Sequence, residues 1–205
     1  MKDKYYIYVF RHGRTFDNIE SRFSGWRDSK LTPSGVDDAK IVAIRLKDKK
    51  IQAAIHTRLT RSQHTLKIAL QSHKECVTLF RDDKMIERSY GSLAGKTHLA
   101  IVKKYGPEQY DQWHRGFYQR LPKGESFADV EKRVGKFVIN LSSFIKKRKC
   151  NVAISAHGNS IRLFRKIIEK KTEKEAVSWE IPYDKVFSYS IEFKGKKAII
   201  KPVKA

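Results

Sequence analysis

The chain opens with an apolar run that stops abruptly at charged residues: Tyr5-Tyr6-Ile7-Tyr8-Val9-Phe10-Arg11-His12-Gly13-Arg14-Thr15. Residues 5–10 are apolar or aromatic and rich in β-formers, so this short run predicts a buried strand. The loop after it carries two arginines, a histidine and a glycine. Because open α/β sheets bind ligands at the carboxyl ends of their strands, this loop is a candidate site.

A second unit of the same kind lies in the other half of the chain. Residues 152–155 (Val-Ala-Ile-Ser) predict another buried strand, and Ala156-His157-Gly158-Asn159-Ser160 follows it. A His-Gly pair therefore leaves the end of each of two strands. We expect the two loops to face one another across one pocket.

The rest of the chain alternates between strand and helix patterns. Further strands are predicted at 51–56 and 77–80, and a terminal hairpin at 188–193 and 198–203. Helical spacing predicts helices over 33–50, 57–70, 98–105, 126–145 and 160–170, one carrying Tyr110, Trp113 and Phe117, and one starting at Thr172. Two of the predicted helices begin with a capping-box pattern: Ser126 with Asp129, and Thr172 with Glu175. This alternation predicts an α/β fold with a largely parallel sheet and an antiparallel edge, in a single domain of residues 1–205.

Composition limits the class of protein and its partners. The 205 residues are 40% hydrophobic, which is enough to bury a core. Lys and Arg number 44 against 22 Asp and Glu, so the net charge of +22 favours anionic partners. Those partners are small phosphorylated substrates, acidic membranes or nucleic acid. A basic stripe interleaved with aromatic residues would favour nucleic acid, and the sequence lacks one, so specific nucleic-acid binding is not expected.

The cysteines and the apolar runs indicate the cellular compartment of the protein. Cys76 and Cys150 have neither the number nor the spacing of a disulfide framework or a zinc site, which favours a reducing compartment. No apolar run approaches the roughly 18 residues of a membrane helix. The first residues do not resemble a signal peptide. We expect a cytoplasmic protein with no membrane partner, and the sequence leaves a homo-oligomer open.

Histidine and arginine in these loops suit phosphoryl transfer. Neutral imidazole is nucleophilic near neutral pH, and the reaction needs positive charge around the phosphate oxygens. The groups that can supply this charge are Arg11, Arg14, Arg61 and His157. A carboxyl group is the natural proton donor for the leaving oxygen, and Glu87, in a glycine-bounded loop, is the candidate. No cluster of carboxylates or histidines has metal-ligand spacing, so no metal is expected.

Seven ordered motifs together resemble the histidine phosphatase (phosphoglycerate mutase-like) superfamily. They are Arg11-His12-Gly13, Asn18, Phe23-Ser24-Gly25-Trp26, Leu31-Thr32-Pro33-Ser34-Gly35, Thr57 with Arg61, the segment from Glu87 to Lys96, and Ala156-His157-Gly158-Asn159-Ser160. The match spans nearly the whole chain. The resemblance implies a three-layer α/β/α fold, with His12 as the residue phosphorylated and Glu87 as proton donor and acceptor. It also implies a phosphate pocket made of Arg11, Asn18, Arg61 and His157.

Within the superfamily, the chain is most similar to the cofactor-dependent phosphoglycerate mutases. The segments that carry this likeness are 87–91, 104–109, 112–115, 124–126, 156–162 and 181–182. It implies interconversion of 3-phosphoglycerate and 2-phosphoglycerate through a phosphohistidine primed by 2,3-bisphosphoglycerate, a reaction of glycolysis and gluconeogenesis. The implied substrate-binding residues are Asn18, Ser24, Gly25, Arg88, Tyr90, His98, His114, Arg115, Gly158 and Asn159.

Three departures from the mutase pattern keep a second function open. A pair of adjacent arginines is replaced by His114-Arg115, and a family lysine falls on His98. The connection from Arg115 to Gly124 lacks a long insertion that covers the pocket in many mutases. An open pocket admits water to the phosphohistidine, so the alternative is a phosphatase on the same fold. A non-catalytic polyanion binder is a third hypothesis, suggested only by the charge.

Overall fold

The computed structural model describes residues 4–195 and 197–203. Within that range one sheet has the strand order β3-β2-β4-β1-β5-β6. The strands are β1 (Lys4–Arg11), β2 (Ala53–His56), β3 (Thr78–Arg81), β4 (Val152–Ala156), β5 (Val186–Lys194) and β6 (Lys197–Pro202). Strands β1 to β4 run parallel, whereas β5 is antiparallel to β1 and β6 is antiparallel to β5. The predicted parallel sheet with an antiparallel edge is confirmed.

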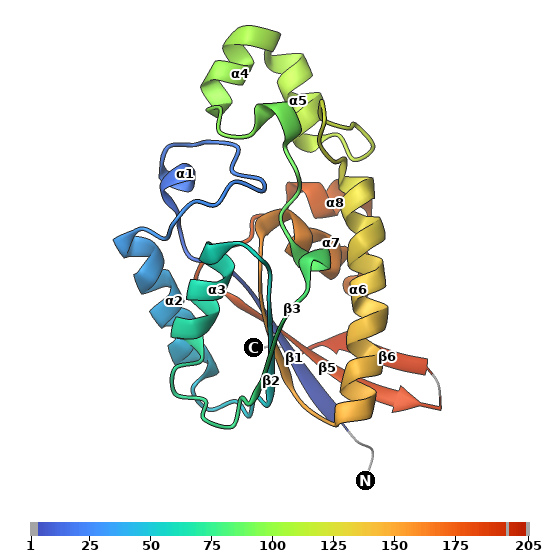
Figure 1. Ribbon diagram of the computed structural model, residues 1–205. Helices are drawn as coiled ribbons and strands as arrows, with labels where there is room; N and C mark the ends of the chain where they lie inside the picture. The colour runs from blue at the N-terminus through green and yellow to red at the C-terminus, as the bar shows by residue number, and fades with distance from the viewer. Residues whose placement is uncertain (1–3, 196, 204–205) are drawn as a thin grey trace.

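Helices cover both faces of the sheet, which makes three layers (Figure 1). Helices α2 and α3 lie on one face, and α6 and α7 lie on the other. The helices are α1 (Phe16–Ile19), α2 (Pro33–Leu46), α3 (Thr60–Ala69), α4 (His98–Tyr105), α5 (Pro107–Arg115), α6 (Phe127–Arg148), α7 (Gly158–Glu169) and α8 (Glu173–Ser178). Short 3₁₀ turns occupy Asp83–Met85 and Gly91–Leu93.

The alternation of side chains along β1 explains why this strand contributes to two hydrophobic cores, one on each face of the sheet. Ile7 and Val9 pack into the cluster under α6 and α7, whereas Tyr8 and Phe10 pack into the cluster under α2 and α3. Successive residues of a strand point to opposite faces, so a strand buried on both sides reads as a continuous apolar run. The run that opens the chain is therefore a central strand.

Helix starts follow the capping patterns of the sequence. Ser126 and Asp129 form a capping box at the start of α6, and Thr172 and Glu175 form one at α8. These caps satisfy backbone N–H groups that the first helical turn leaves unpaired. Thr32 caps α2, accepting a hydrogen bond of 3.0 Å from the N–H of Gly35.

Several boundaries differ from the prediction. The helix carrying Tyr110 and Trp113 ends at Arg115, because Gly116 turns to an extended conformation, and Phe117 packs into the core from the following loop. Helix α2 ends at Leu46 and α3 begins at Thr60. The terminal hairpin has the predicted strands, and Lys196 of its turn lies outside the described residues.

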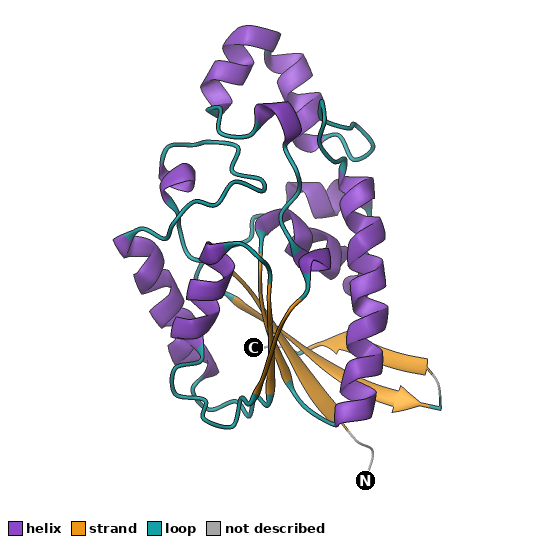
Figure 2. Cartoon of the chain, viewed as in Figure 1, coloured by secondary structure: helices purple, strands orange, loops and turns teal. Residues whose placement is uncertain are grey.

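Helices α4 and α5 stand beyond the carboxyl ends of the parallel strands, at the top of Figure 1. Their own small core contains Phe23, Leu93, Ile101, Trp113 and Leu121. This core fastens the loop around Phe23 to the two helices. Figure 2 shows that the region between the sheet and this helical cap is built mainly from loops.

Candidate active site

The register of β1 and β4 brings the two His-Gly loops together. Arg11 lies opposite Ala156, and the N–H of His12 donates to the Ala156 carbonyl at 3.0 Å. His12 directly follows the end of β1, and His157 directly follows the end of β4. Their ring centroids are 5.0 Å apart. The expectation that the two loops face one another is confirmed.

Gly13 allows the loop after β1 to lie close to the start of α2. A Cβ atom on Gly13 would lie 2.0 Å from the carbonyl oxygen of Gly35. No side chain fits at that distance, so both glycines are needed for the close backbone approach. Thr65 Oγ1 accepts a hydrogen bond of 3.0 Å from the Gly13 N–H.

His12 is buried, with only 2% of its surface exposed, and its tautomer follows from its contacts. Nδ1 lies 2.8 Å from the Gly13 carbonyl oxygen, which can only accept, so Nδ1 carries the proton. Nε2 is therefore unprotonated, and its lone pair accepts a hydrogen bond of 3.2 Å from the Nε–H of Arg61. Burial, together with the charges of Arg61 and Arg11, holds the pKa of His12 well below its ordinary value. His12 is therefore uncharged at neutral pH.

Arg61 holds a positive charge beside the His12 ring. Its Nε lies 3.2 Å from His12 Nε2, while Nη1 and Nη2 donate to the carbonyls of Arg27 (2.6 Å) and Gly25 (2.7 Å). Only 1% of its surface is exposed. Across the described residues no carboxylate forms an ion pair with it, so its charge is available to an anion.

Three buried polar atoms near His12 have no hydrogen-bond partner among the described residues. They are Arg11 Nε, Ser24 Oγ and His157 Nδ1. His157 Nε2 is occupied by Thr57 Oγ1 at 2.8 Å, and Arg11 Nη1 donates to the Ile181 carbonyl. Buried polar groups in proteins are normally paired. Unpaired ones gathered around an uncharged histidine indicate a site for a ligand rich in acceptor oxygens.

Glu87 is fixed by one of its two carboxylate oxygens. Oε1 accepts hydrogen bonds from the N–H groups of Arg88 (2.7 Å) and Asn159 (3.2 Å). Oε2 has no hydrogen bond within the described chain, and it lies beside Gly158 at the edge of the cavity. The carboxylate is thus oriented, with one oxygen free for proton transfer.

These groups line a small cavity of about 170 Å³. Most of the predicted site residues lie on its wall: Arg11, His12, Asn18, Ser24, Gly25, Arg61, Glu87, Tyr90, His98, His114, Gly158 and Asn159. His157 is not part of the wall, but its ring centroid lies 5.0 Å from that of His12. The cavity is therefore formed by loops that follow β1, β2 and β4 together with the helical cap.

Aromatic and histidine rings form the wall contributed by the cap. The His98 ring stacks on Phe23 with a centroid distance of 4.0 Å, and it lies 5.4 Å from the His114 ring. His98 Nδ1 shares a hydrogen bond of 2.8 Å with the hydroxyl of Tyr110. Burial lowers the pKa of His98. Burial and then the charge of Arg115 lower the pKa of His114 to about 3. Both rings are uncharged at neutral pH.

Comparison with known proteins places the chain in a family. The model of the histidine phosphatase superfamily (branch 1) matches residues 7–204. The chain belongs to this superfamily. The 2,3-bisphosphoglycerate-dependent phosphoglycerate mutase of Chlamydia felis is 30% identical over 210 residues, covering 90% of this chain and 92% of that protein.

Two solved structures share the histidine phosphatase fold. Bacillus stearothermophilus YhfR has a TM-score of 0.80 and is 26% identical, covering 94% of this chain and 93% of its own. A mycobacterial glucosyl-3-phosphoglycerate phosphatase has a TM-score of 0.83 at 20% identity, covering 97% of each chain. At that identity the likeness shows the fold alone.

Two predicted substrate residues lie away from the cavity wall. The Arg88 guanidinium is fully buried, donates to the carbonyls of Glu125 and Gln119, and lies 4.5 Å from the centre of the Phe127 ring. Arg115 donates to the Val177 carbonyl at 2.6 Å. These contacts hold the loop after α5 and the end of α8, so direct contact of either arginine with substrate stays a prediction.

The cavity also has lining residues that the sequence analysis did not assign: Arg22, Phe23 and Arg162. Arg162 follows Asn159 by three residues on α7, so helical periodicity places both on one face. This spacing from a predicted site residue is the sequence signal that could have identified Arg162. Arg162 Nη1 donates to Asn159 Oδ1 at 2.6 Å. Arg22 is paired with Glu20.

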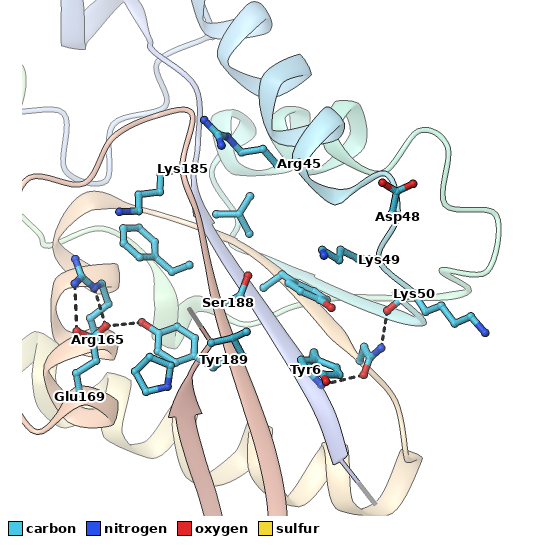
Figure 3. Close-up of a pocket in the computed structure, with 16 residues that line it drawn as sticks. Tyr6, Arg45, Asp48, Lys49, Lys50, Arg165, Glu169, Lys185, Ser188 and Tyr189 are labelled. Carbon is cyan, nitrogen blue, oxygen red and sulfur yellow. Dashed lines mark hydrogen bonds and ion pairs between the residues drawn. The ribbon is translucent and has the colours of Figure 1, made fainter. Parts of the chain in front are cut away.

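A larger groove, of about 940 Å³, lies away from this site at β5 (Figure 3). Arg165 and Glu169 form a two-point ion pair there, and Glu169 also accepts from the Tyr189 hydroxyl. Lys49, Lys50 and Lys185 lie around it. None of the groove residues is a histidine or a cysteine, whereas the cavity is lined by three histidines.

Within the described residues, no group of three or more His, Cys, Asp or Glu side chains is arranged to hold a metal ion. No helix of residues 4–195 and 197–203 is long and apolar enough to cross a membrane.

Proposed function

We propose that this protein interconverts 3-phosphoglycerate and 2-phosphoglycerate through a phosphohistidine on His12. The observation that carries the proposal is the buried, uncharged His12, whose unprotonated Nε2 accepts a hydrogen bond from Arg61, together with the unpaired polar atoms of Arg11, Ser24 and His157. The similarity to mutases over most of the chain supports the choice of substrate.

In this proposal each group has its own role. His12 Nε2 attacks phosphorus while the bond from phosphorus to the ester oxygen breaks, and Arg61 and Arg11 neutralise the charge on the phosphoryl oxygens. Glu87, through its free Oε2, gives a proton to the leaving oxygen. In the second step the glycerate hydroxyl attacks the phosphohistidine, the N–P bond breaks, and Glu87 takes the hydroxyl proton. Asn18, Tyr90, Gly158 and Asn159 enclose the glycerate portion.

The residues around His12 also fit one phosphate of 2,3-bisphosphoglycerate. The polar atoms of Arg11, Ser24 and His157 that lack partners would hold it. When bound, this primer supplies the phosphoryl group that first loads the enzyme.

A phosphatase is the second candidate function, and the wall formed by His98 and His114 favours it. Uncharged rings hold an anionic acceptor less firmly than two cations, so water competes for the phosphohistidine. The short connection between α5 and α6 acts in the same direction.

The test is an assay of purified protein with 3-phosphoglycerate, with and without catalytic 2,3-bisphosphoglycerate. Formation of 2-phosphoglycerate and release of phosphate are followed in the same sample. Isomerisation that needs the bisphosphate, with little phosphate released, supports the mutase. Phosphate release without isomerisation supports the phosphatase.

His12→Ala is expected to abolish both activities and the acid-labile phosphate on the protein. The matched control is His64→Ala, because His64 is an exposed histidine of α3. Turnover that survives in His12→Ala overturns the mechanism for both candidate functions.

A further inference from the structure

The segment that carries Glu87 belongs to neither a helix nor a strand. Residues 86–90 follow the 3₁₀ turn at Asp83–Met85 and precede the one at Gly91–Leu93. The backbone groups of such a segment need hydrogen-bond partners from elsewhere in the protein. Because Glu87 transfers the proton in the proposed function, the groups that fix this segment also fix the proton-transfer group.

Arg133, on α6, supplies two of these partners. Its Nη1 donates to the carbonyl of Lys84 at 2.7 Å, and its Nη2 donates to the carbonyl of Glu87 at 3.0 Å. One guanidinium therefore spans the backbone from Lys84 to Glu87. The indole N–H of Trp26 donates to the same Glu87 carbonyl at 2.7 Å, so this carbonyl is held by two donors.

Glu125 binds both Arg133 and the residues that follow Glu87. Its carboxylate forms a two-point ion pair with Arg133, at 2.9 Å to Nε and 3.1 Å to Nη2. Its Oε2 also accepts the N–H of Ser89 at 2.8 Å. The backbone N–H of Glu125 donates to the Ser89 carbonyl at 3.0 Å, and its backbone carbonyl accepts from Nε of Arg88 at 2.8 Å. The pair thus holds the backbone on both sides of Glu87.

The ion pair is largely shielded from solvent and lies outside the cavity. The side chains of Arg133 and Glu125 are 17% and 18% exposed, and neither is among the residues that line the cavity. A two-point contact fixes the plane of the guanidinium. Glu87 Oε1 accepts the N–H of Arg88, the next residue, so a shift of this backbone carries the carboxylate with it.

We propose that Arg133 and Glu125 are positioning residues for proton transfer by Glu87. They fix the backbone from Lys84 to Ser89 and thereby hold Glu87 Oε2 at the edge of the cavity. A misplacement of about 1 Å is enough to slow such a step by about 10²-fold. This inference rests on the proposed function, and it adds two residues that the reaction needs although neither lines the cavity.

The test compares two phosphate donors that differ in their need for an acid. Rapid-quench measurements follow the formation of acid-labile phosphohistidine from 2,3-bisphosphoglycerate and from p-nitrophenyl phosphate. The leaving alkoxide of the bisphosphate needs a proton, whereas the nitrophenolate does not. In Arg133→Gln we expect the rate with the bisphosphate to fall by about ten- to a hundredfold. The rate with the aryl phosphate should change by less than about threefold, because no proton is needed. Loss of structure would lower both rates together.

A double variant shows whether Arg133 acts through Glu87. Glu87→Gln cannot give a proton, so adding Arg133→Gln should lower the bisphosphate rate by less than about twofold further. Arg133→Lys is the conservative variant, and it should recover part of the rate because an ammonium group still donates to backbone carbonyls. Glu125→Gln removes the counter-charge and should lower the bisphosphate rate selectively, as Arg133→Gln does. These two variants give the same comparison if Arg133→Gln does not fold.

Arg120→Gln is the matched control. Arg120 forms the same kind of two-point ion pair beside the start of α6, with Asp129, at 2.9 and 2.7 Å. Neither Arg120 nor Asp129 lines the cavity. We expect both phosphorylation rates to equal those of the wild type.

Three results overturn the inference: an unchanged bisphosphate rate in Arg133→Gln, an equal loss with both donors, or the full loss again when Arg133→Gln is added to Glu87→Gln. Failure of the proposed function is a separate result. It shows as absence of phosphohistidine in the wild-type protein with either donor, before any variant is compared.

Discussion

The small cavity at His12 and the large groove at β5 contain similar kinds of side chains in different states. In the groove, the guanidinium of Arg165 is matched by Glu169, which also accepts from Tyr189 (Figure 3). In the cavity, the partners of Arg61 among the described residues are backbone carbonyls and a histidine. The groove has more than five times the volume, at about 940 Å³ against about 170 Å³.

The comparison teaches that unmatched charge, rather than volume, marks the site. Burying a cation without a counter-charge costs free energy, and a protein keeps such an arrangement where a ligand completes it. A charge that is already paired within the protein does not require a ligand. Variants in the two regions should therefore differ in what they change.

The largest effect after loss of His12 is expected from Glu87→Gln. The amide keeps the shape but cannot give a proton, so kcat with 3-phosphoglycerate should fall by about 10² to 10⁴. An activated aryl phosphate should lose much less, because its leaving group needs no proton. An equal loss with both esters would show that Glu87 only supports the structure.

Arg61→Gln should have the next largest effect. Loss of the guanidinium removes charge stabilisation of the phosphoryl group, so kcat/KM should fall by about 10² to 10³. It also leaves the carbonyls of Gly25 and Arg27 unpaired, which should lower the free energy of unfolding by about 1–3 kcal/mol. Reduced stability with unchanged kcat/KM would restrict Arg61 to a structural role.

The buried histidines of the cavity should make stability depend on pH. Burial is the main cause that lowers the pKa of His12, His114 and His157 below the ordinary value of 6.5. The unfolded chain takes up protons as the pH falls through 6.5 and the folded chain does not, so stability is complete above that pH and is lost below it.

Below pH 6.5, the free energy of unfolding is expected to fall by about 1.4 kcal/mol per pH unit for each histidine that stays neutral when folded. Urea unfolding measured on both sides of this range gives the slope, and His114→Gln should reduce it by one proton's contribution. An unchanged slope in His114→Gln would contradict the low pKa of His114.

The smallest effect on activity is expected from Arg165→Gln in the groove. Its partner Glu169 remains bonded to Tyr189, so the free energy of unfolding should fall by only about 1 kcal/mol. kcat and KM should equal those of the wild type. A clear fall in kcat/KM would show that the groove and the cavity are coupled, and the contrast between the two regions would fail.

Much of the fold was predictable because its signals are local. The apolar run of β1 and the capping boxes of α6 and α8 lie within a few neighbouring residues. The end of α5 was missed because apolar residues recur past it to Phe117, and Gly116 ends the helix before that residue. Tertiary packing then buries Phe117 from a loop.

Sequence by itself determined that His12 and His157 lie at the same edge of the sheet. Each follows a buried strand, and parallel strands end at the same edge of a sheet, so only the adjacency of β1 and β4 had to be added. The residue types then indicated phosphoryl chemistry.

Only the tertiary structure decided which side chains form the cavity wall contributed by the helical cap. His98 and His114 lie on different helices, and their proximity depends on how α4 and α5 pack over Phe23. Arg88 follows Glu87 in an irregular loop, which has no periodicity to say where a side chain points, and it faces the interior. Long-range packing sets such directions, and a pattern along the chain does not contain them.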